Sequence, residues 1–267
     1  MVIDGRKIAE EILEETKNEI QKSGLKLKLA AVLVGGHAES RKFLKLKEIA
    51  AKKIGIDFRL YEFPANITTQ ELHKEITNII KVKINSGIII ELPLPKHINA
   101  QYILNAVPEE KDPDVLSQKA QGVFFANRSP ILPPAVEAVR VILRHSKINL
   151  KGKNCTVFGY GLLVGKPVSH WLASQGTTVS IVNEFTPNPA DLSRTADIIV
   201  SGVDKPNLVT ADMVKDGAIV IDFAKDVDFE KVASKASFIT PPIGGVGPIV
   251  VAAVLKNLII LANKKAP

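Results

Sequence analysis

The chain has 267 residues, of which 46% are hydrophobic and 24% are charged, and its formal net charge is +7. This composition excludes a disordered chain and is sufficient for one large core or two modest ones. The lysines are spread along amphipathic segments and aromatic residues make up only 5%, so the positive charge does not predict nucleic-acid binding. The chain has one cysteine and no apolar run of about 20 residues, and no basic segment followed by an apolar stretch opens it. We therefore expect a cytoplasmic protein that does not enter a membrane.

The first part of the chain alternates the patterns of helices and strands. Apolar residues at helical spacing predict a helix from Asp4 to about Gly24. Thr68 and Glu71 form a capping-box pair at the start of another helix. Continuous apolar runs between the helices predict strands of a parallel sheet that is covered on both faces. These runs lie at 29–34, 58–63 and 87–90.

A stretch rich in proline and charge, at 107–134, separates this series from a second one. The second series predicts a helix at 134–145, strands at 155–158, 178–182, 197–200 and 218–221, and a final apolar helix at 248–262. The sequence thus predicts an α/β fold with two lobes, and the second lobe is Rossmann-like. We place the first lobe at 1–133, completed by the C-terminal helix 248–267, and the second at 134–247.

A glycine-rich turn follows the strand that ends at Phe158. The segment Gly-Tyr-Gly-Leu-Leu-Val-Gly, at 159–165, opens a helix. Such a turn lets the backbone approach a pyrophosphate, and the helix N-terminus adds amide donors and a favourable dipole. A strand before the turn and a helix after it favour dinucleotide binding over a turn without a ligand. The residues that we assign to the cofactor here are Gly159, Tyr160, Gly161, Val164 and Gly165.

Glu184 follows the next predicted strand, where folds of this kind hold the adenosine ribose. A carboxylate at this point accepts hydrogen bonds from both ribose hydroxyls and repels a 2′-phosphate. Glu184 therefore favours NAD over NADP. The alternative interpretation is a solvated loop glutamate that points elsewhere.

Three further segments give the sequence a specific resemblance. They are Ser-Arg-Lys-Phe-Leu-Lys-Leu-Lys at 40–47, Glu-Leu-Pro-Leu-Pro at 91–95 with Lys-Asp-Pro-Asp at 111–114, and Ile-Thr-Pro-Pro-Ile-Gly-Gly-Val-Gly-Pro at 239–248. In this order, and together with the glycine turn, they resemble the methylenetetrahydrofolate dehydrogenase/cyclohydrolase family over nearly the whole chain. The resemblance implies oxidation of 5,10-methylenetetrahydrofolate with NADP or NAD, followed by hydrolysis of the product to 10-formyltetrahydrofolate.

The resemblance also implies where the folate binds and which residues act on it. It places the folate in a cleft between the lobes, with the N-terminal lobe as the folate-binding lobe. Lys47 matches the family's key lysine, near the reacting one-carbon unit, and Asp114 matches the aspartate that binds the pteridine ring. Without the resemblance, Lys47 would be interpreted as a solvated lysine on a helix and Asp114 as a polar residue of a linker. The other residues implied to bind substrate are Phe43, Leu92, Pro93, Asp112, Gly244, Gly245 and Pro248.

Several residues depart from the family pattern. Phe43 replaces a tyrosine and loses its hydroxyl, and Glu91 replaces a glutamine. We assign Glu91 to the catalytic group, since it would place a carboxylate beside Lys47. An anionic Glu91 favours a charged Lys47 and so opposes proton transfer by that lysine. We therefore expect the hydrolysis to be weakened more than the hydride transfer.

Further departures lie where the resemblance places the two ligands. Val115 replaces a glycine, and Gly161 replaces a serine of the cofactor loop. Tyr160 stands where some members have an arginine, which reduces the donors for a 2′-phosphate. Lys225, which we assign to cofactor binding, lies in the altered segment 222–226, where the nicotinamide end is implied to sit.

Two alternatives to this enzyme remain open from the sequence. One is a non-catalytic folate-binding or interaction homologue of the family. The other is a different two-lobed dehydrogenase that resembles shikimate dehydrogenase, although the three segments argue against it. The histidines are scattered without paired ligand spacing, so we predict no metal site. The resemblance also suggests a homodimer.

Overall fold

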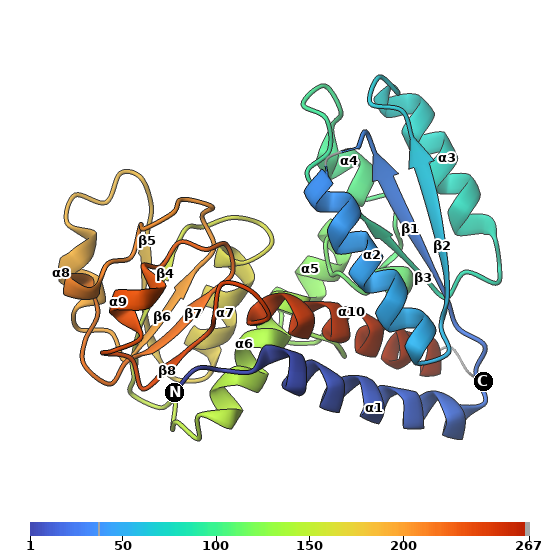
Figure 1. The fold of residues 1–267 in the computed structure, drawn as a ribbon. Helices are drawn as coiled ribbons and strands as arrows, with labels where there is room; N and C mark the ends of the chain where they lie inside the picture. Colours follow the sequence, from blue (N-terminus) through green and yellow to red (C-terminus); the bar gives the residue numbers. More distant parts are fainter. Residues whose placement is uncertain (37, 265–267) are drawn as a thin grey trace. The chain divides into compact units, whose positions relative to one another are not determined.

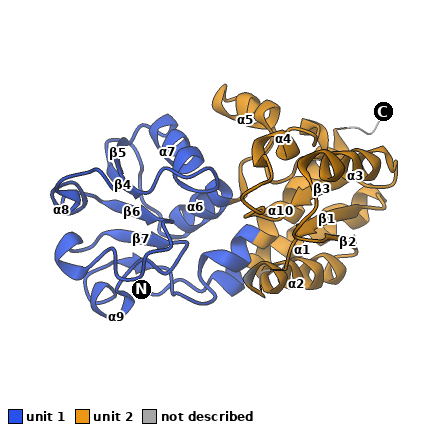
Figure 2. Cartoon of the chain, turned by 90° about the horizontal axis from the view of Figure 1, so that it is seen from above, with its two compact units in different colours: residues 1–8, 135–250 blue, residues 9–134, 251–267 orange. Residues whose placement is uncertain are grey.

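A computed structural model describes residues 1–36 and 38–264 of the chain. The chain divides into two compact units (Figure 2). Unit 1 comprises residues 1–8 and 135–250, and unit 2 comprises residues 9–134 and 251–267. The last residues of the predicted C-terminal helix, 265–267, lie outside the described residues.

Unit 2 is built on a three-stranded parallel sheet in the order β2-β1-β3 (Figure 1). The strands are β1 (Lys28–Val34), β2 (Asp57–Phe63) and β3 (Gly87–Ile90). The sheet is parallel and contains the three strands predicted for this part of the chain, so that prediction is confirmed. The central strand β1 and the edge strand β3 are buried, whereas the other edge strand, β2, is largely exposed. The expected cover on both faces is therefore wrong for β2.

Helices of several lengths pack around this sheet. Thr68 Oγ1 accepts the Glu71 N–H at 3.2 Å, and a Glu71 carboxylate oxygen accepts the Thr68 N–H at 2.9 Å, which confirms the capping box. The predicted connection at 107–134 contains more structure than expected, since it holds a 3₁₀ turn and an α-helix. The elements are α1 (Gly5–Ser23), α2 (Ala38–Lys53), α3 (Thr69–Lys81), α4 (Ala100–Leu104), η1 (Glu109–Lys111) and α5 (Gln118–Phe125).

Unit 1 is built on a five-stranded parallel sheet in the order β5-β4-β6-β7-β8 (Figure 1). The strands are β4 (Asn154–Phe158), β5 (Thr178–Val182), β6 (Ile198–Ser201), β7 (Ile219–Asp222) and β8 (Phe238–Ile239). Four of them were predicted, and the two-residue strand β8 was not. The remaining helical elements are α6 (Pro134–His145), α7 (Gly165–Ser174), α8 (Pro189–Ser193), η2 (Ala211–Met213), α9 (Phe229–Val232) and α10 (Val246–Asn263).

The last helix, α10, has a mean hydropathy of 1.9 over 18 residues. By length and composition alone it could cross a membrane, but 61% of it is buried inside the protein, as in a core helix. Its packing within unit 2 is close: a Cβ atom on Gly87 would lie 2.4 Å from Cδ1 of Leu258. A larger residue at Gly87 would therefore force the Leu258 side chain to move.

Candidate active site

The carboxyl ends of β1 and β3 bring Lys47 and Glu91 together. Glu91 directly follows β3, and its N–H donates to the Val32 carbonyl at 2.9 Å, while Lys47 lies on α2, which follows β1. Lys47 Nζ lies 2.8 Å from Glu91 Oε2, and the two side chains are only 7% and 8% exposed. The Phe43 ring lies one turn earlier on α2, with its centroid 5.0 Å from the same Nζ. The ammonium group thus has an anionic and an aromatic neighbour.

Asp114 joins this pair electrostatically. Burial raises the pKa of Glu91, the ammonium of Lys47 opposes that rise, and the charge of Asp114 adds to it. Burial also raises the pKa of Asp114, again opposed by Lys47. Lys47 acts on both carboxyl groups and Asp114 acts on Glu91, so the three residues form one electrostatic unit of a cation and two carboxyl groups. The structure therefore brings together the three residues that were predicted to be catalytic, although their roles stay a prediction.

Asp112 has a different environment from Asp114. It is only 3% exposed, and its Oδ2 accepts the N–H groups of Leu116 at 2.9 Å and Ser117 at 2.8 Å. Burial raises its pKa to about 6, against the opposing effect of the Ser117 and Leu116 hydrogen bonds. Asp112 thus braces the turn that carries Asp114, and the substrate contact predicted for it stays a prediction. Val115 within this turn has a φ of +57°, which is unfavourable for a β-branched residue.

Asn257 is a site-supporting residue that was not predicted. Its Nδ2 donates hydrogen bonds of 2.8 Å to the carbonyls of Pro113 and Leu132. It therefore ties the Asp114 loop to α10 from a buried position. The available signal was a polar residue in the middle of an otherwise apolar helix.

Leu92 and Pro93 continue from Glu91 at the end of β3. Leu92 is half-buried and Pro93 is exposed, and the peptide bond between them is cis. Both residues belong to unit 2 and directly follow Glu91 in the sequence. Their predicted roles in substrate binding stay a prediction.

The glycine turn of unit 1 has the geometry of a backbone that a ligand can approach. Gly159 has a φ of +88°. A Cβ atom on Gly165 would lie 2.2 Å from the Gly159 carbonyl oxygen, whereas one on Gly161 would meet open space. Gly165 is thus needed for packing, and Gly161 leaves room beside the N-terminus of α7. Tyr160 is exposed and Val164 half-buried in the same turn. These features fit the pyrophosphate of a dinucleotide.

Other predicted residues of unit 1 lie at the carboxyl ends of its strands. Glu184 is exposed after β5, and Lys225 is exposed after β7 with a φ of +64°. The predicted residues of the final glycine-rich loop have a different setting. Gly244 and Gly245 lie against the start of α1, where a Cβ atom on Gly5 would lie 1.7 Å from the Gly245 carbonyl oxygen. This packing requires small residues whether or not a ligand binds. Pro248 is half-buried near the beginning of α10.

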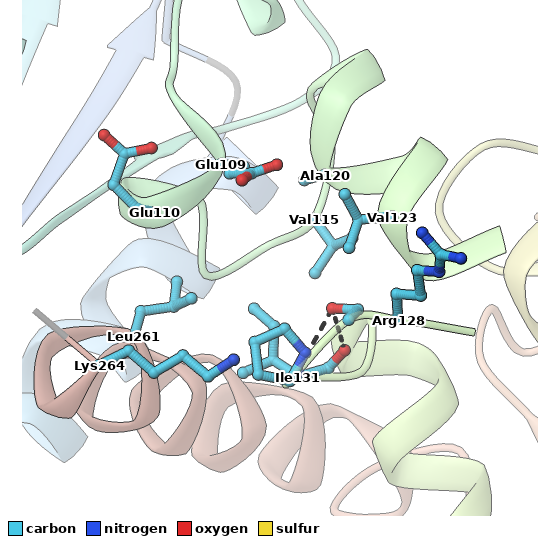
Figure 3. Close-up of a pocket in the computed structure, with 11 residues that line it drawn as sticks. Glu109, Glu110, Val115, Ala120, Val123, Arg128, Ile131, Leu261 and Lys264 are labelled. Atoms are coloured by element: carbon cyan, nitrogen blue, oxygen red, sulfur yellow. Dashed lines mark hydrogen bonds between the residues drawn. The ribbon is translucent and has the colours of Figure 1, made fainter. Parts of the chain in front are cut away.

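One cavity in unit 2, of about 290 Å³, holds none of the predicted site residues (Figure 3). Its wall includes Val115, Ile131 and Leu261, and its charged residues are Glu109, Glu110, Arg128 and Lys264. Val115 is the neighbour of Asp114 in sequence, but the candidate site is the group around Lys47 rather than this cavity.

Comparisons with known proteins match most of the chain. Residues 3–114 match the family model for the tetrahydrofolate dehydrogenase/cyclohydrolase catalytic domain, and residues 133–266 match the model for its NAD(P)-binding domain. The chain is 40% identical over 278 residues to the bifunctional protein FolD of Nautilia profundicola, covering 99% of this chain and 98% of the relative.

Solved structures of two such enzymes are also similar to this chain. The FolD methylenetetrahydrofolate dehydrogenase/cyclohydrolase of Campylobacter jejuni gives a TM-score of 0.94 at 33% identity, covering 100% of this chain and 99% of that one. The Trypanosoma brucei enzyme, complexed with NADP and an inhibitor, gives a TM-score of 0.94 at 32% identity with the same coverage. The sequence comparison and the structural comparison thus agree with each other over nearly the whole chain.

Proposed function

Because the chain belongs to the tetrahydrofolate dehydrogenase/cyclohydrolase family, we propose that it oxidises 5,10-methylenetetrahydrofolate to 5,10-methenyltetrahydrofolate and hydrolyses this product to 10-formyltetrahydrofolate. The observation that carries the proposal is the buried pair of Lys47 and Glu91, with Asp114 in the same electrostatic unit. Nothing in the described residues or in the comparisons favours the non-catalytic alternative. The matches to this family also outweigh the shikimate dehydrogenase alternative.

The charges of the site suit the oxidation step. Loss of hydride from the methylene carbon leaves a positive charge on the substrate, and NAD(P), when bound, accepts that hydride. A lone ammonium near this carbon would oppose the developing charge. Here Glu91 neutralises Lys47, and Asp114 adds a further carboxyl group when it is ionised. We therefore infer that the site stabilises the methenyl cation by electrostatics.

The same charges disfavour the hydrolysis step. Water must add to the methenyl carbon and lose a proton, so a proton acceptor is needed. Lys47 Nζ lies 2.8 Å from Glu91 Oε2, and this ion pair would have to break before the lysine could serve as that acceptor. A negative environment also stabilises the cation that hydrolysis must consume. We infer that hydrolysis is retained but slower than oxidation.

Asp114 is proposed to bind the pteridine ring. An ionised carboxylate can accept two N–H donors of that heterocycle side by side. Burial raises the pKa of Asp114 and Lys47 counteracts this rise, so Lys47 also supports the form of Asp114 that binds. Phe43 would offer its ring face near the same ammonium. We place Leu92, Pro93, Gly244, Gly245 and Pro248 around the substrate on the basis of the family pattern alone.

The protein uses NAD(P), and we propose that it prefers NAD. Glu184 is exposed directly after β5, where its carboxylate can face the ribose hydroxyls. Tyr160 and Gly161 add no cationic group for a 2′-phosphate. The Trypanosoma brucei enzyme was solved in complex with NADP, so we rest the preference on Glu184 and the glycine turn of the present chain. We further propose a cytoplasmic homodimer, with a folate-binding domain at 1–133 plus 248–267 and a cofactor-binding domain at 134–247.

Turnover with the purified protein tests this function. The protein would be incubated with 5,10-methylenetetrahydrofolate and either NAD or NADP while the absorbance of the reduced cofactor is followed. We expect reduced cofactor to form with both, at a higher kcat/KM with NAD. A folded protein that reduces neither cofactor would refute the proposal and favour the non-catalytic homologue.

A further inference from the structure

The carboxylate of Asp226 is fully buried, and the reaction described above assigns it no role. Its Oδ2 accepts hydrogen bonds from Ser201 Oγ at 2.5 Å and from the Val203 N–H at 2.8 Å, and its Oδ1 accepts the Lys205 N–H at 2.7 Å. Burying a carboxylate is unfavourable unless donors replace its lost water. These bonds therefore fix the carboxylate and the backbone that donates to it.

The backbone held by Asp226 is the loop after β6, residues 202–205, and this loop packs against the glycine turn. A Cβ atom on Gly159 would lie 3.0 Å from Cγ2 of Val203, and one on Gly202 would lie 3.1 Å from Cβ of Val164. Each segment thus presents a glycine to a valine of the other. With so little free space between them, a displacement of the loop would be transmitted to the turn.

Asp226 is itself held by a second carboxylate. Asp222, at the end of β7, accepts the N–H groups of Ala224 at 3.0 Å and Asp226 at 3.1 Å through Oδ1, and that of Val227 at 3.0 Å through Oδ2. These bonds close the turn in which Lys225 has a positive φ. Contacts thus run from Asp222 at the end of β7 to Asp226, from Asp226 to the loop after β6, and from that loop to the glycine turn after β4.

The position of this chain in the sheet connects it with the cofactor. Strands β4 and β6 are neighbours, and β5 continues the sheet on the other side of β4 (Figure 1). The chain therefore runs from β4 to β5 on one side of the sheet and from β6 to β7 on the other, so the strand order reverses between β4 and β6. Dinucleotides bind in the crevice outside the carboxyl ends of the strands at a reversal of this kind. The glycine turn follows β4 and the loop 202–205 follows β6, so they lie at the ends of the two strands that flank this point.

We propose that Asp226 is a positioning residue for the dinucleotide: it holds the loop 202–205 against the glycine turn and so sets the shape of the crevice. It acts through the backbone of Val203 and Lys205 and does not itself touch the cofactor. The inference rests on the proposed use of NAD(P), but it concerns a residue and a loop to which the reaction assigns no part.

The test compares Asp226→Asn with Asp212→Asn in the full chain. Asparagine has one acceptor oxygen, so it cannot satisfy both the Lys205 N–H and the pair of donors at Oδ2. Asp212 is an exposed carboxylate of the same unit that accepts a hydrogen bond from Thr210 Oγ1. We would titrate each protein with NADH and with NADPH by fluorescence, without folate, and record the thermal unfolding midpoint separately.

The expected result is a Kd for both dinucleotides that rises about tenfold in Asp226→Asn and stays within about twofold in Asp212→Asn. A folded Asp226→Asn that binds both as the wild type does would overturn the proposal, even if its unfolding midpoint is lower. If Asp226→Asn does not fold, Ser201→Ala decides, because it removes one of the donors. A Kd raised about threefold or more supports the proposal, and an unchanged Kd overturns it.

The wild-type titration separates this proposal from the proposed function. A wild-type protein that binds neither NADH nor NADPH would refute both. A wild type that binds, with folded variants that bind equally well, would refute the role of Asp226 alone.

Discussion

Lys47 Nζ lies 2.8 Å from Glu91 Oε2, with less than a tenth of either side chain exposed. A pair so placed is held by attraction in a poorly solvated environment, and removing one partner leaves an uncompensated buried charge. The pair therefore fixes the position of the lysine and sets a carboxylate against its charge. Its effect on the two reactions of the site can be measured separately.

Replacing Glu91 by glutamine should raise the rate of hydrolysis relative to that of oxidation, by roughly tenfold. The amide keeps an oxygen that accepts a hydrogen bond from Lys47, but it removes the negative charge that pairs with the ammonium and stabilises the cation that hydrolysis must consume. Initial rates of both reactions would be measured with purified protein. Glu48→Gln is the control, since Glu48 lies on α2 and pairs with Lys45 and Lys52 instead.

Slower hydrolysis in Glu91→Gln would contradict this explanation. It would identify the Glu91 carboxylate as the base that accepts the proton from water. Equal changes in both rates would mean that Glu91 has only a general influence on the site.

The ratio of hydrolysis to oxidation should depend on pH. Burial raises the pKa of Glu91 in spite of Lys47, so the group takes up a proton at a higher pH than an ordinary glutamate. As pH falls through that pKa, Glu91 loses the negative charge that stabilises the methenyl cation, so oxidation should slow and the ratio should rise. Rates of the wild type from pH 8 to pH 5 would be compared with those of Glu91→Gln, which has no carboxyl group at this position and should lack the rise. A wild-type ratio that does not rise relative to that of Glu91→Gln as the pH falls would contradict the charge argument.

Asp112 should make folding stability depend on pH. Its pKa is about 6 in the folded protein against an ordinary value of 3.8. Between these values the folded state binds more protons than the unfolded state, so the contribution of Asp112 to the free energy of unfolding falls as pH rises from 4 to 6. The total change is up to roughly 3 kcal/mol, from 1.36 kcal/mol per pKa unit.

Asp112→Asn should remove this contribution. Its single oxygen can still accept the N–H groups of Leu116 and Ser117, which now share one carboxylate oxygen. Urea unfolding at pH 4, 5, 6 and 7 would give the difference between variant and wild type at each pH. The free energy of unfolding of the variant, relative to that of the wild type, should increase as pH rises from 4 to 6. A difference that is constant with pH would refute the raised pKa of Asp112.

Glu184→Ala should shift the cofactor preference towards NADP. Loss of the carboxylate removes both the acceptor for the ribose hydroxyls and the repulsion of a 2′-phosphate. We expect the ratio of kcat/KM with NADP to that with NAD to rise by roughly tenfold. Glu230→Ala, at another exposed glutamate of unit 1, should leave the ratio unchanged. An unchanged ratio in Glu184→Ala would mean that this side chain points away from the ribose.

Much of the fold was predictable because its longer elements have clear periods. The strands of unit 2 and the capping box of α3 were read from local sequence. The helices α4, α5, α8 and α9 were missed, because helices of 4 to 8 residues are too short to show a helical period. Ser117 was a readable signal for α5, since its side chain caps that helix by accepting the Ala120 N–H.

The site was less predictable from local pattern. Lys47 and Glu91 are 44 positions apart, so neither period nor composition relates them, and only the resemblance brought them together. The roles of Asn257 and Asp226 depend on which backbone groups they meet in the folded chain. Such contacts between distant segments leave no local signal beyond a polar residue in an apolar surrounding.

The most direct test of the account is the fate of the methenyl product. The wild-type protein would convert 5,10-methylenetetrahydrofolate with NAD, and 5,10-methenyltetrahydrofolate would be measured by its absorbance during turnover and again after acid quench, which returns any 10-formyltetrahydrofolate to the methenyl form. If the Lys47 and Glu91 pair favours oxidation over hydrolysis, the methenyl product accumulates during turnover. If it appears only after the quench, hydrolysis keeps pace with oxidation and the charge pair does not restrain it.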